Sequence, residues 1–197
     1  MHPSLVDPKA AALVVMDYQT AVVEMTTPTP DDLLARTASL LADARAAGVR
    51  VIYVVVGYRD GYPEVGPHSP TFGPVRDGGR FAEGAPGTAV HAALAPRPGD
   101  VVVTKRRVSA FFGTDLDLIL RANGTTTLIL AGIATSGVVL STVRHATDAD
   151  YRVVVVEDCC ADRDAELHGV LMERVFARWT TVVKAADVFA PAARGDR

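Results

Sequence analysis

Six short apolar runs recur along the chain, and they are the candidate strands of one sheet. Each run is rich in Val, Ile and Leu, and its apolar residues follow one another without the alternation of a half-exposed strand. Strands of this kind are buried on both faces, which is typical of a parallel sheet covered by helices. The runs lie at residues 12–16, 51–56, 101–104, 127–131, 153–156 and 180–184.

Segments with helical signals separate these runs. The first begins with Thr29 and Pro30, an N-cap followed by proline at the first helical position, and it is expected to stop at Gly48. Three further helices are predicted at residues 114–123, 136–148 and 162–179. Because strands and helices alternate, we expect an α/β fold with a doubly wound, mostly parallel sheet and helices on both of its faces.

A long segment rich in glycine and proline, residues 58–87, interrupts the alternation. A loop of this length in a compact domain usually has a function or is mobile. It follows the second run, so it is predicted at the carboxyl edge of the sheet, where open α/β sheets bind ligands. The length of 197 residues favours one domain over residues 1–197, with a loose tail at about 190–197.

Composition and charge narrow the classes of function. Hydrophobic residues make up 49% of the chain, which argues against a disordered protein. The net charge of −3 and the lack of a basic patch disfavour nucleic acid or a membrane as partner. We read no secretory signal and no stretch of the roughly 20 apolar residues that span a bilayer, so a cytoplasmic protein is expected. The adjacent Cys159 and Cys160 are expected to be structural and not paired.

Polar groups follow three of the predicted strands. Asp17 follows the first run, Lys105 the third, and a glycine-bounded turn at residues 132–138 the fourth. Carboxyl ends of neighbouring strands meet in one crevice, where an Asp–Lys pair poises the acid for proton transfer. The turn offers backbone N–H groups to a carboxylate or an oxyanion. The plainer alternative is a turn-forming Asp and a solvated Lys.

The turn has the glycine spacing of a phosphate-binding loop without its chemistry. Val138 and Val139 stand where such a loop has Lys and then Ser or Thr. The segment after the first run also lacks Gly-x-Gly-x-x-Gly, the pattern of a dinucleotide-binding loop. A dinucleotide-binding oxidoreductase is therefore disfavoured, and no cofactor is expected.

Three segments, in order, resemble the isochorismatase-like, or cysteine hydrolase, superfamily. They are ALVVMDYQ from residue 12, TKRRVSAFFGTDLDLILRANG from residue 104, and LILAGIATSGVVLSTVRHATDADYRVVVVEDCCAD from residue 128. The resemblance implies a six-stranded, Rossmann-like sheet in three layers. It also implies a homodimer or a higher homo-oligomer.

The resemblance implies a catalytic triad of Asp, Lys and Cys. Asp17 and Lys105 match its first two members, but Val138 stands at the position of the cysteine. Valine has no nucleophile, so covalent thioester chemistry at this position is excluded. Neither Ser136 nor Ser141 is expected to replace it, because the first fits a helix cap and the second lies one turn deeper.

The resemblance also indicates the surroundings of the site. It implies a cis peptide bond between Ile133 and Ala134. This bond and the turn up to Val138 would direct main-chain N–H groups at a substrate. Phe111 and Thr135 are expected to contact the substrate.

No metal site is expected in this chain. Nicotinamidases of the superfamily carry an Asp-x-His motif with a further His after the second strand. Asp60 and His68 are present in that region but not at that spacing.

Isochorismatases of the same superfamily lack the cysteine and use their Asp as a general acid. We therefore expect a hydrolase that acts on a small molecule, at a vinyl ether or amide bond, with Asp17 as general acid or base, Lys105 as its partner and no covalent intermediate. The alternative is a non-catalytic binding or assembly protein on a degenerate hydrolase scaffold. The long loop is expected to determine which substrate is bound.

Overall fold

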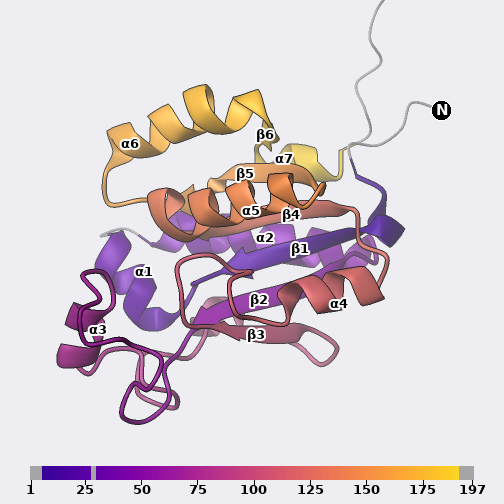
Figure 1. Cartoon of the computed structure of the whole chain (residues 1–197). Helices are drawn as coiled ribbons and strands as arrows, with labels where there is room; N and C mark the ends of the chain where they lie inside the picture. Colours follow the sequence, from indigo (N-terminus) through magenta and orange to yellow (C-terminus); the bar gives the residue numbers. More distant parts are fainter. Residues whose placement is uncertain (1–5, 28–29, 191–197) are drawn as a thin grey trace, which may run out of the picture.

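Each of the six apolar runs contains or lies in a strand, and the strands form one sheet in the computed structural model of the chain (Figure 1). The structure describes residues 6–27 and 30–190, so the N-cap predicted at Thr29 and the tail beyond residue 190 lie outside the described residues. The strand order is β3-β2-β1-β4-β5-β6, and every neighbouring pair is parallel. The strands are β1 Ala11–Met16, β2 Arg50–Val56, β3 Val101–Lys105, β4 Thr127–Ile133, β5 Arg152–Ala161 and β6 Thr181–Val183.

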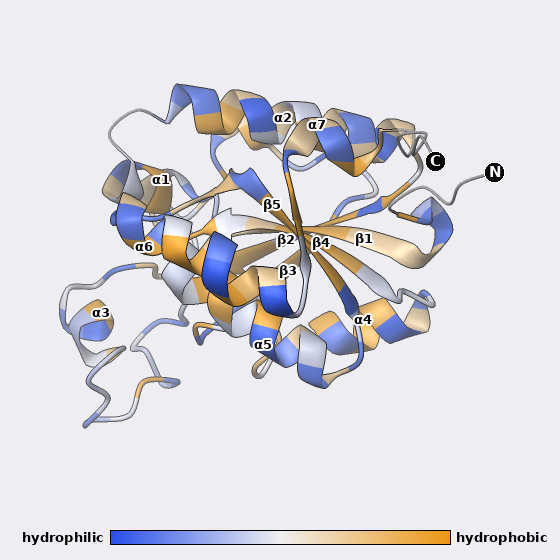
Figure 2. Cartoon of the chain, turned by 90° about the horizontal axis from the view of Figure 1, so that it is seen from above, coloured by the Kyte–Doolittle hydropathy of each residue, from blue (hydrophilic) through white to orange (hydrophobic). Residues whose placement is uncertain are grey.

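Helices cover both faces of the sheet, as the apolar pattern predicts. Figure 2 shows α2 and α7 on one face and α4 and α5 on the other. Successive residues of β1 alternate between two apolar cores, with Leu13 in the core beneath α2 and Val14 in the core beneath α5. The α-helices are α1 Thr20–Thr26, α2 Asp31–Ala46, α3 Gly73–Asp77, α4 Leu116–Ala122, α5 Leu140–Asp148, α6 Ala165–Val170 and α7 Ala185–Val188. The predicted doubly wound α/β fold is confirmed.

Two of the predicted helices are less regular than expected. The segment predicted at 136–148 opens with a π-helical turn, Thr135–Val139, before α5 begins. The segment predicted at 162–179 consists of α6, a second π-helical turn at Leu171–Val175 and a 3₁₀ turn at Phe176–Arg178. Further 3₁₀ turns occupy Pro8–Ala10 and Ala92–Leu94. Helices α1, α3 and α7 have no counterpart in the sequence-based prediction.

The strand order places the crevice of the sheet beside β1. The chain winds outward in opposite directions from β1 and β4, and ligands of open α/β sheets bind beyond the carboxyl ends of strands at such a switch point. The segment 58–87, which includes α3, lies at this edge (Figure 1). Its first residue is joined there to a later part of the segment, because the Tyr58 N–H donates to the Phe81 carbonyl at 2.8 Å. None of the helices in the described part of the chain is long and apolar enough to span a bilayer.

Candidate active site

Asp17 and Lys105 form a buried ion pair at the carboxyl edge of the sheet. Asp17 follows β1 directly and Lys105 is the last residue of β3. Lys105 Nζ lies 2.9 Å from Asp17 Oδ2, and the two side chains are only 4% and 9% exposed. The ammonium also donates to the carbonyl of Arg107 at 3.1 Å. The structure therefore brings together the acid and the lysine that the sequence separates by most of the first half of the chain.

The environment of Asp17 suits a group that exchanges a proton. Burial raises the pKa of this carboxyl, and the charge and hydrogen bond of Lys105 act in the opposite direction. Oδ1 is buried and has no hydrogen-bond partner among the described residues. The backbone of Asp17 has φ of 59°, a left-handed conformation that Asp and Asn adopt more readily than most residues. Within residues 6–27 and 30–190, the carboxyl thus has one oxygen on Lys105 and one oxygen without a partner.

The turn after β4 lies beside this pair. The Ile133–Ala134 peptide bond is cis, at the position that the resemblance implies. The N–H of Ala134 donates to no residue in the described part of the chain. The N–H of Ser136 donates to Asp162 Oδ2 at 2.7 Å, which ties the turn to the segment after β5. The turn is thus held from outside while Ala134 keeps a main-chain donor available.

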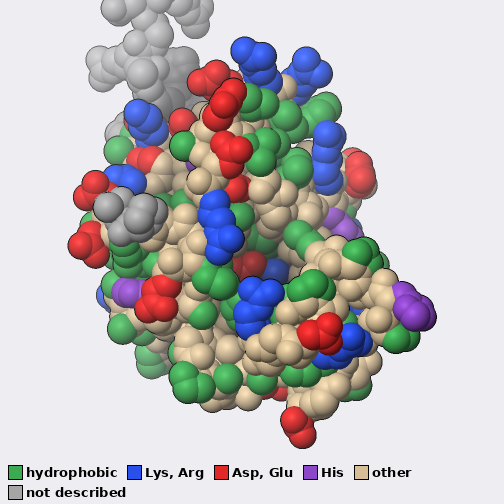
Figure 3. Space-filling model, turned by 90° about the vertical axis from the view of Figure 1, so that its left-hand side faces the viewer, with side chains coloured by type: hydrophobic (Ala, Val, Ile, Leu, Met, Phe, Trp, Pro, Cys, Tyr) green, Lys and Arg blue, Asp and Glu red, His purple; other side chains and the backbone are tan. Residues whose placement is uncertain are grey.

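One cavity of about 250 Å³ joins these groups. Asp17, Lys105, Ala134 and Val138 all line it. Seen from the carboxyl ends of the strands, the surface is hollowed near its centre, and acidic and basic side chains lie within the recess (Figure 3). The site residues predicted on three separate strands therefore meet in one place.

Phe111 and Thr135 were expected to contact a substrate, but they do not line this cavity. The Phe111 ring is buried and stacks on His145 with centroids 4.4 Å apart. The Thr135 side chain is fully buried, and its hydroxyl lies 2.8 Å from His168 Nδ1. Both side chains instead have their partners in the helices α5 and α6.

The aromatic wall of the cavity comes instead from the long loop. Phe72 and Phe81 both line it, and sequence reasoning did not single them out. The available signal was the predicted position of residues 58–87 at the carboxyl edge of the sheet. The loop is fastened there by ion pairs of Arg106 with Glu64, at 2.7 Å, and with Glu83.

Arg107 adds a second cation to the cavity lining. Its guanidinium donates to the carbonyls of Arg106 and Glu64, at 2.6 and 2.7 Å, and lies 5.0 Å from the centroid of the Phe72 ring. No carboxylate within the described ranges forms an ion pair with it. Since Lys105 is paired with Asp17, the cavity carries one positive charge in excess, which suits an anionic ligand.

Other candidate groups lie apart from this chemistry. Cys159 and Cys160 are both free and buried, and burial raises the pKa of Cys159 to about 12. A thiol of that kind stays protonated and unreactive near neutral pH. Within residues 6–27 and 30–190, no group of three or more His, Cys, Asp or Glu side chains is placed to hold a metal ion.

The fold and the site together define a three-layer α/β protein with a buried acid–lysine pair at the switch point of its sheet. Residues 11–187 match the model of the isochorismatase domain, and the chain therefore belongs to the isochorismatase family of hydrolases. This result confirms the resemblance found in the sequence.

Three relatives show how closely the chain follows this family. It is 33% identical to the ureidoacrylate amidohydrolase RutB of Methylobacterium radiotolerans, over 94% of this chain and 81% of that protein. A cysteine hydrolase structure from Pseudomonas syringae superposes with a TM-score of 0.86 at 27% identity, over 96% of this chain and 97% of that one. The N-carbamoylsarcosine amidase of Thermoplasma acidophilum superposes with a TM-score of 0.76 at 30% identity, over 91% and 99%.

Proposed function

We propose that this protein hydrolyses a C–O or C–N bond of a small acid by proton transfer at Asp17, without a covalent enzyme intermediate. The observation that carries the proposal is the buried Asp17–Lys105 pair on a cavity whose neighbouring side chain, Val138, cannot attack a substrate. Water takes the place of a protein nucleophile. Asp17 must either take a proton from this water or protonate the substrate before the water adds.

For a vinyl ether, Asp17 acts as general acid. Its carboxyl donates a proton to the terminal carbon of the double bond, which leaves an oxygen-stabilised cation at the next carbon. Water adds to that cation and returns a proton to Asp17, and the adduct then splits into a ketone and an alcohol. The raised pKa of Asp17 supports this role, because it increases the fraction of carboxyl that still carries a proton.

For an amide or carbamoyl group, Asp17 acts first as general base. It takes a proton from water as the water oxygen bonds to the carbonyl carbon, and the resulting oxyanion is stabilised by the N–H of Ala134. The C–N bond then breaks, and Asp17 gives the proton to the departing nitrogen. The names of two relatives, an amidohydrolase and an amidase, favour this bond class.

The lining of the cavity favours a substrate that carries a carboxylate. Arg107 offers a guanidinium without an acidic partner in the described chain, and a cavity of about 250 Å³ suits a small molecule. An anion there balances the excess positive charge of the lining. The N–H groups of a guanidinium also have the geometry that suits a carboxylate.

The test is turnover of a panel of vinyl ether acids and N-carbamoyl amino acids by the wild type and by Asp17→Asn. Asparagine keeps the size of the side chain and tolerates φ of 59°. We expect the substitution to lower kcat/KM at least about 10²-fold, the usual contribution of general acid–base catalysis. The matched control is Asp43→Asn on the exposed face of α2, which is expected to leave the rate unchanged. Equal rates for the wild type and Asp17→Asn would remove Asp17 from the mechanism.

Val138 favours a second candidate, a binding protein on the hydrolase scaffold. It is 2% exposed and supplies only methyl groups to the cavity. Val138→Cys separates the two candidates, since the new thiol would stand beside the turn and the Asp17–Lys105 pair. Amidase activity that appears in this variant, together with labelling by iodoacetamide, means that the remaining machinery is competent. A variant and a wild type that both bind the acids without turning them over favour the binding protein.

A further inference from the structure

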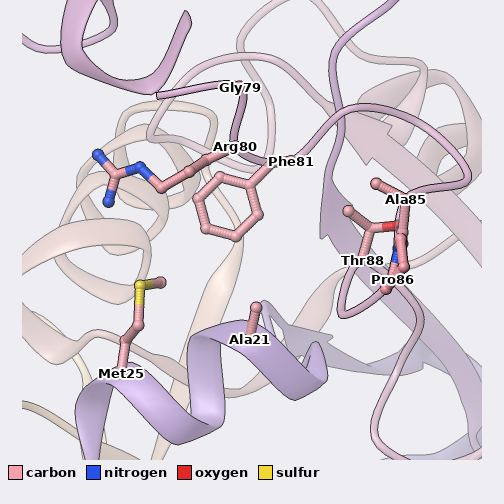
Figure 4. Close-up of a pocket in the computed structure, with 8 residues that line it drawn as sticks. All are labelled: Ala21, Met25, Gly79, Arg80, Phe81, Ala85, Pro86 and Thr88. Atoms are coloured by element: carbon pink, nitrogen blue, oxygen red, sulfur yellow. The ribbon is translucent and has the colours of Figure 1, made fainter. Parts of the chain in front are cut away.

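A second cavity adjoins the proposed active cavity, and the mechanism above makes no use of it. Its volume is about 200 Å³, and it lies between α1 and residues 79–88 of the long loop and its continuation (Figure 4). Met25 and Phe81 line both cavities, so these two side chains form a shared partition. We infer that the second cavity is the distal subsite of the active site, which takes an aromatic or similarly sized apolar group of the substrate. This inference rests on the proposed function.

The partition between the two cavities is built into the backbone. Phe81 has φ of 60°, a left-handed conformation that is rare for a bulky residue and is usually kept where the surrounding structure enforces it. The Tyr58 N–H enforces it here by donating to the Phe81 carbonyl at 2.8 Å. The Met25 carbonyl is held by Arg163 Nε at 2.6 Å. Both backbones are thus fixed, while the methionine side chain remains adaptable to the shape of a ligand.

The walls of the second cavity are fixed as well. Gln19 is fully buried and donates to the carbonyls of Val56 and Thr88, at 2.9 and 2.7 Å, which joins the end of β2 to the loop. The Ala21 N–H donates to the Gly87 carbonyl at 3.0 Å, and a Cβ on Gly87 would approach the Ala21 Cβ to 3.0 Å. The loop therefore packs on α1 so closely that the cavity is already formed without a ligand, as small-molecule sites usually are.

The lining determines what the cavity can bind. Five of its eight lining residues are apolar: Ala21, Met25, Phe81, Ala85 and Pro86. The hydroxyl of Thr88 is engaged with the Ala85 carbonyl at 2.6 Å. Figure 4 shows the Phe81 ring facing into the space, with the Arg80 guanidinium at its rim. Arg80 has no ion pair among the described residues and reaches only the Pro74 carbonyl, at 3.5 Å.

This chemistry matches an apolar ring that carries a negatively charged or hydrogen-bond-accepting substituent. The ring contacts Phe81, Met25 and the alanines, and the substituent points to Arg80. A substrate that fills both cavities has its reacting bond beside Asp17 and its apolar group beyond Phe81. A substrate without such a group fills the first cavity alone.

Equilibrium binding of benzoate tests the site itself, measured by calorimetry and by ligand-observed NMR. Ala85→Leu fills the cavity, and Arg80→Gln removes its cation. We expect the Kd of benzoate to rise about tenfold or more in Ala85→Leu and about fivefold in Arg80→Gln. The controls are Ala89→Leu, on an exposed loop position outside both cavities, and Arg76→Gln, on α3, and both should bind as the wild type does. Failure of benzoate to bind the wild type, or binding that survives Ala85→Leu, overturns the inference.

A pair of acids tests the connection to the active site without requiring turnover. N-carbamoylphenylalanine is expected to bind the wild type about tenfold more tightly than N-carbamoylglycine, and Ala85→Leu should abolish that difference without changing the Kd of the glycine compound. Equal affinities, a difference that persists in Ala85→Leu, or no binding of either acid overturns the subsite. If instead the difference behaves as expected but Asp17→Asn turns over substrate as fast as the wild type, the proposed function fails and the subsite stands.

Discussion

The buried ion pair makes a quantitative prediction about stability. Lys105→Met keeps the aliphatic stem and removes the ammonium. Among the described residues, Asp17 Oδ2 then loses its one partner, and Oδ1 already has none. With the two side chains 4% and 9% exposed, removal of one partner should cost about 3–5 kcal/mol of the free energy of unfolding. Asp17→Asn should cost less, because the Lys105 ammonium keeps the Arg107 carbonyl at 3.1 Å.

The double variant Asp17→Asn/Lys105→Met removes both charges. Its cost should fall short of the sum of the two single costs by about 1–3 kcal/mol, since side chains in direct contact are coupled by that much. The assay is urea denaturation at pH 7, followed by circular dichroism, with m-values compared to verify two-state unfolding. Asp43→Asn and Lys184→Met change the same residue types on exposed positions and should each stay within about 0.5 kcal/mol of the wild type. Strictly additive costs, or a cost below about 1 kcal/mol for Lys105→Met, would refute the reasoning.

Four further predictions concern the same edge of the sheet. Burial raises the pKa of Asp17 and Lys105 opposes this, so Lys105→Met should raise that pKa further. General-acid activity is lost as the pH rises through the pKa of Asp17. In profiles of kcat/KM against pH, this loss should therefore move to higher pH in the variant. Because the pKa of Asp17 is raised in the folded state, its contribution to the free energy of unfolding should grow as the pH falls from that pKa to the pKa of the unfolded chain. Asp17→Asn should weaken this dependence of stability on pH in denaturation curves. Gly132→Ala should cost about 1–3 kcal/mol in thermal unfolding, because its Cβ would come within 3.1 Å of neighbouring side chains, whereas Gly169→Ala, with open space around it, should not destabilise the protein by this mechanism. Asp162→Ala should lower kcat more than it raises KM, because the Asp162 carboxylate accepts a hydrogen bond from the Ser136 N–H at 2.7 Å and so positions the turn. An unchanged kcat would contradict this positioning role.

The apolar pattern was sufficient to predict the strands and the edge of the sheet at which the site lies. Runs such as 127–131 are buried on both faces, as is typical of strands in a parallel sheet covered by helices. Asp17 and Lys105 could be found because each directly follows or ends such a run, and topology then brings the two together.

The remaining features depend on contacts that no local pattern encodes. Helix α1 is short, rich in β-branched residues and has no side-chain cap, so its propensity is weak; it forms where Gln19 and the loop hold its first turn. Phe111 and Phe81 look alike in the sequence, but the first packs on His145 and the second lines the cavity. The choice between them is made by tertiary packing of segments far apart in the chain.

The most direct test of the central claim is the mass of the intact protein, quenched within milliseconds during turnover of its best substrate from the panel. If Asp17 and water carry the reaction, the chain should keep its unmodified mass throughout the steady state while product accumulates. A transient increase in mass by the acyl or carbamoyl part of the substrate would show a covalent intermediate and contradict the account.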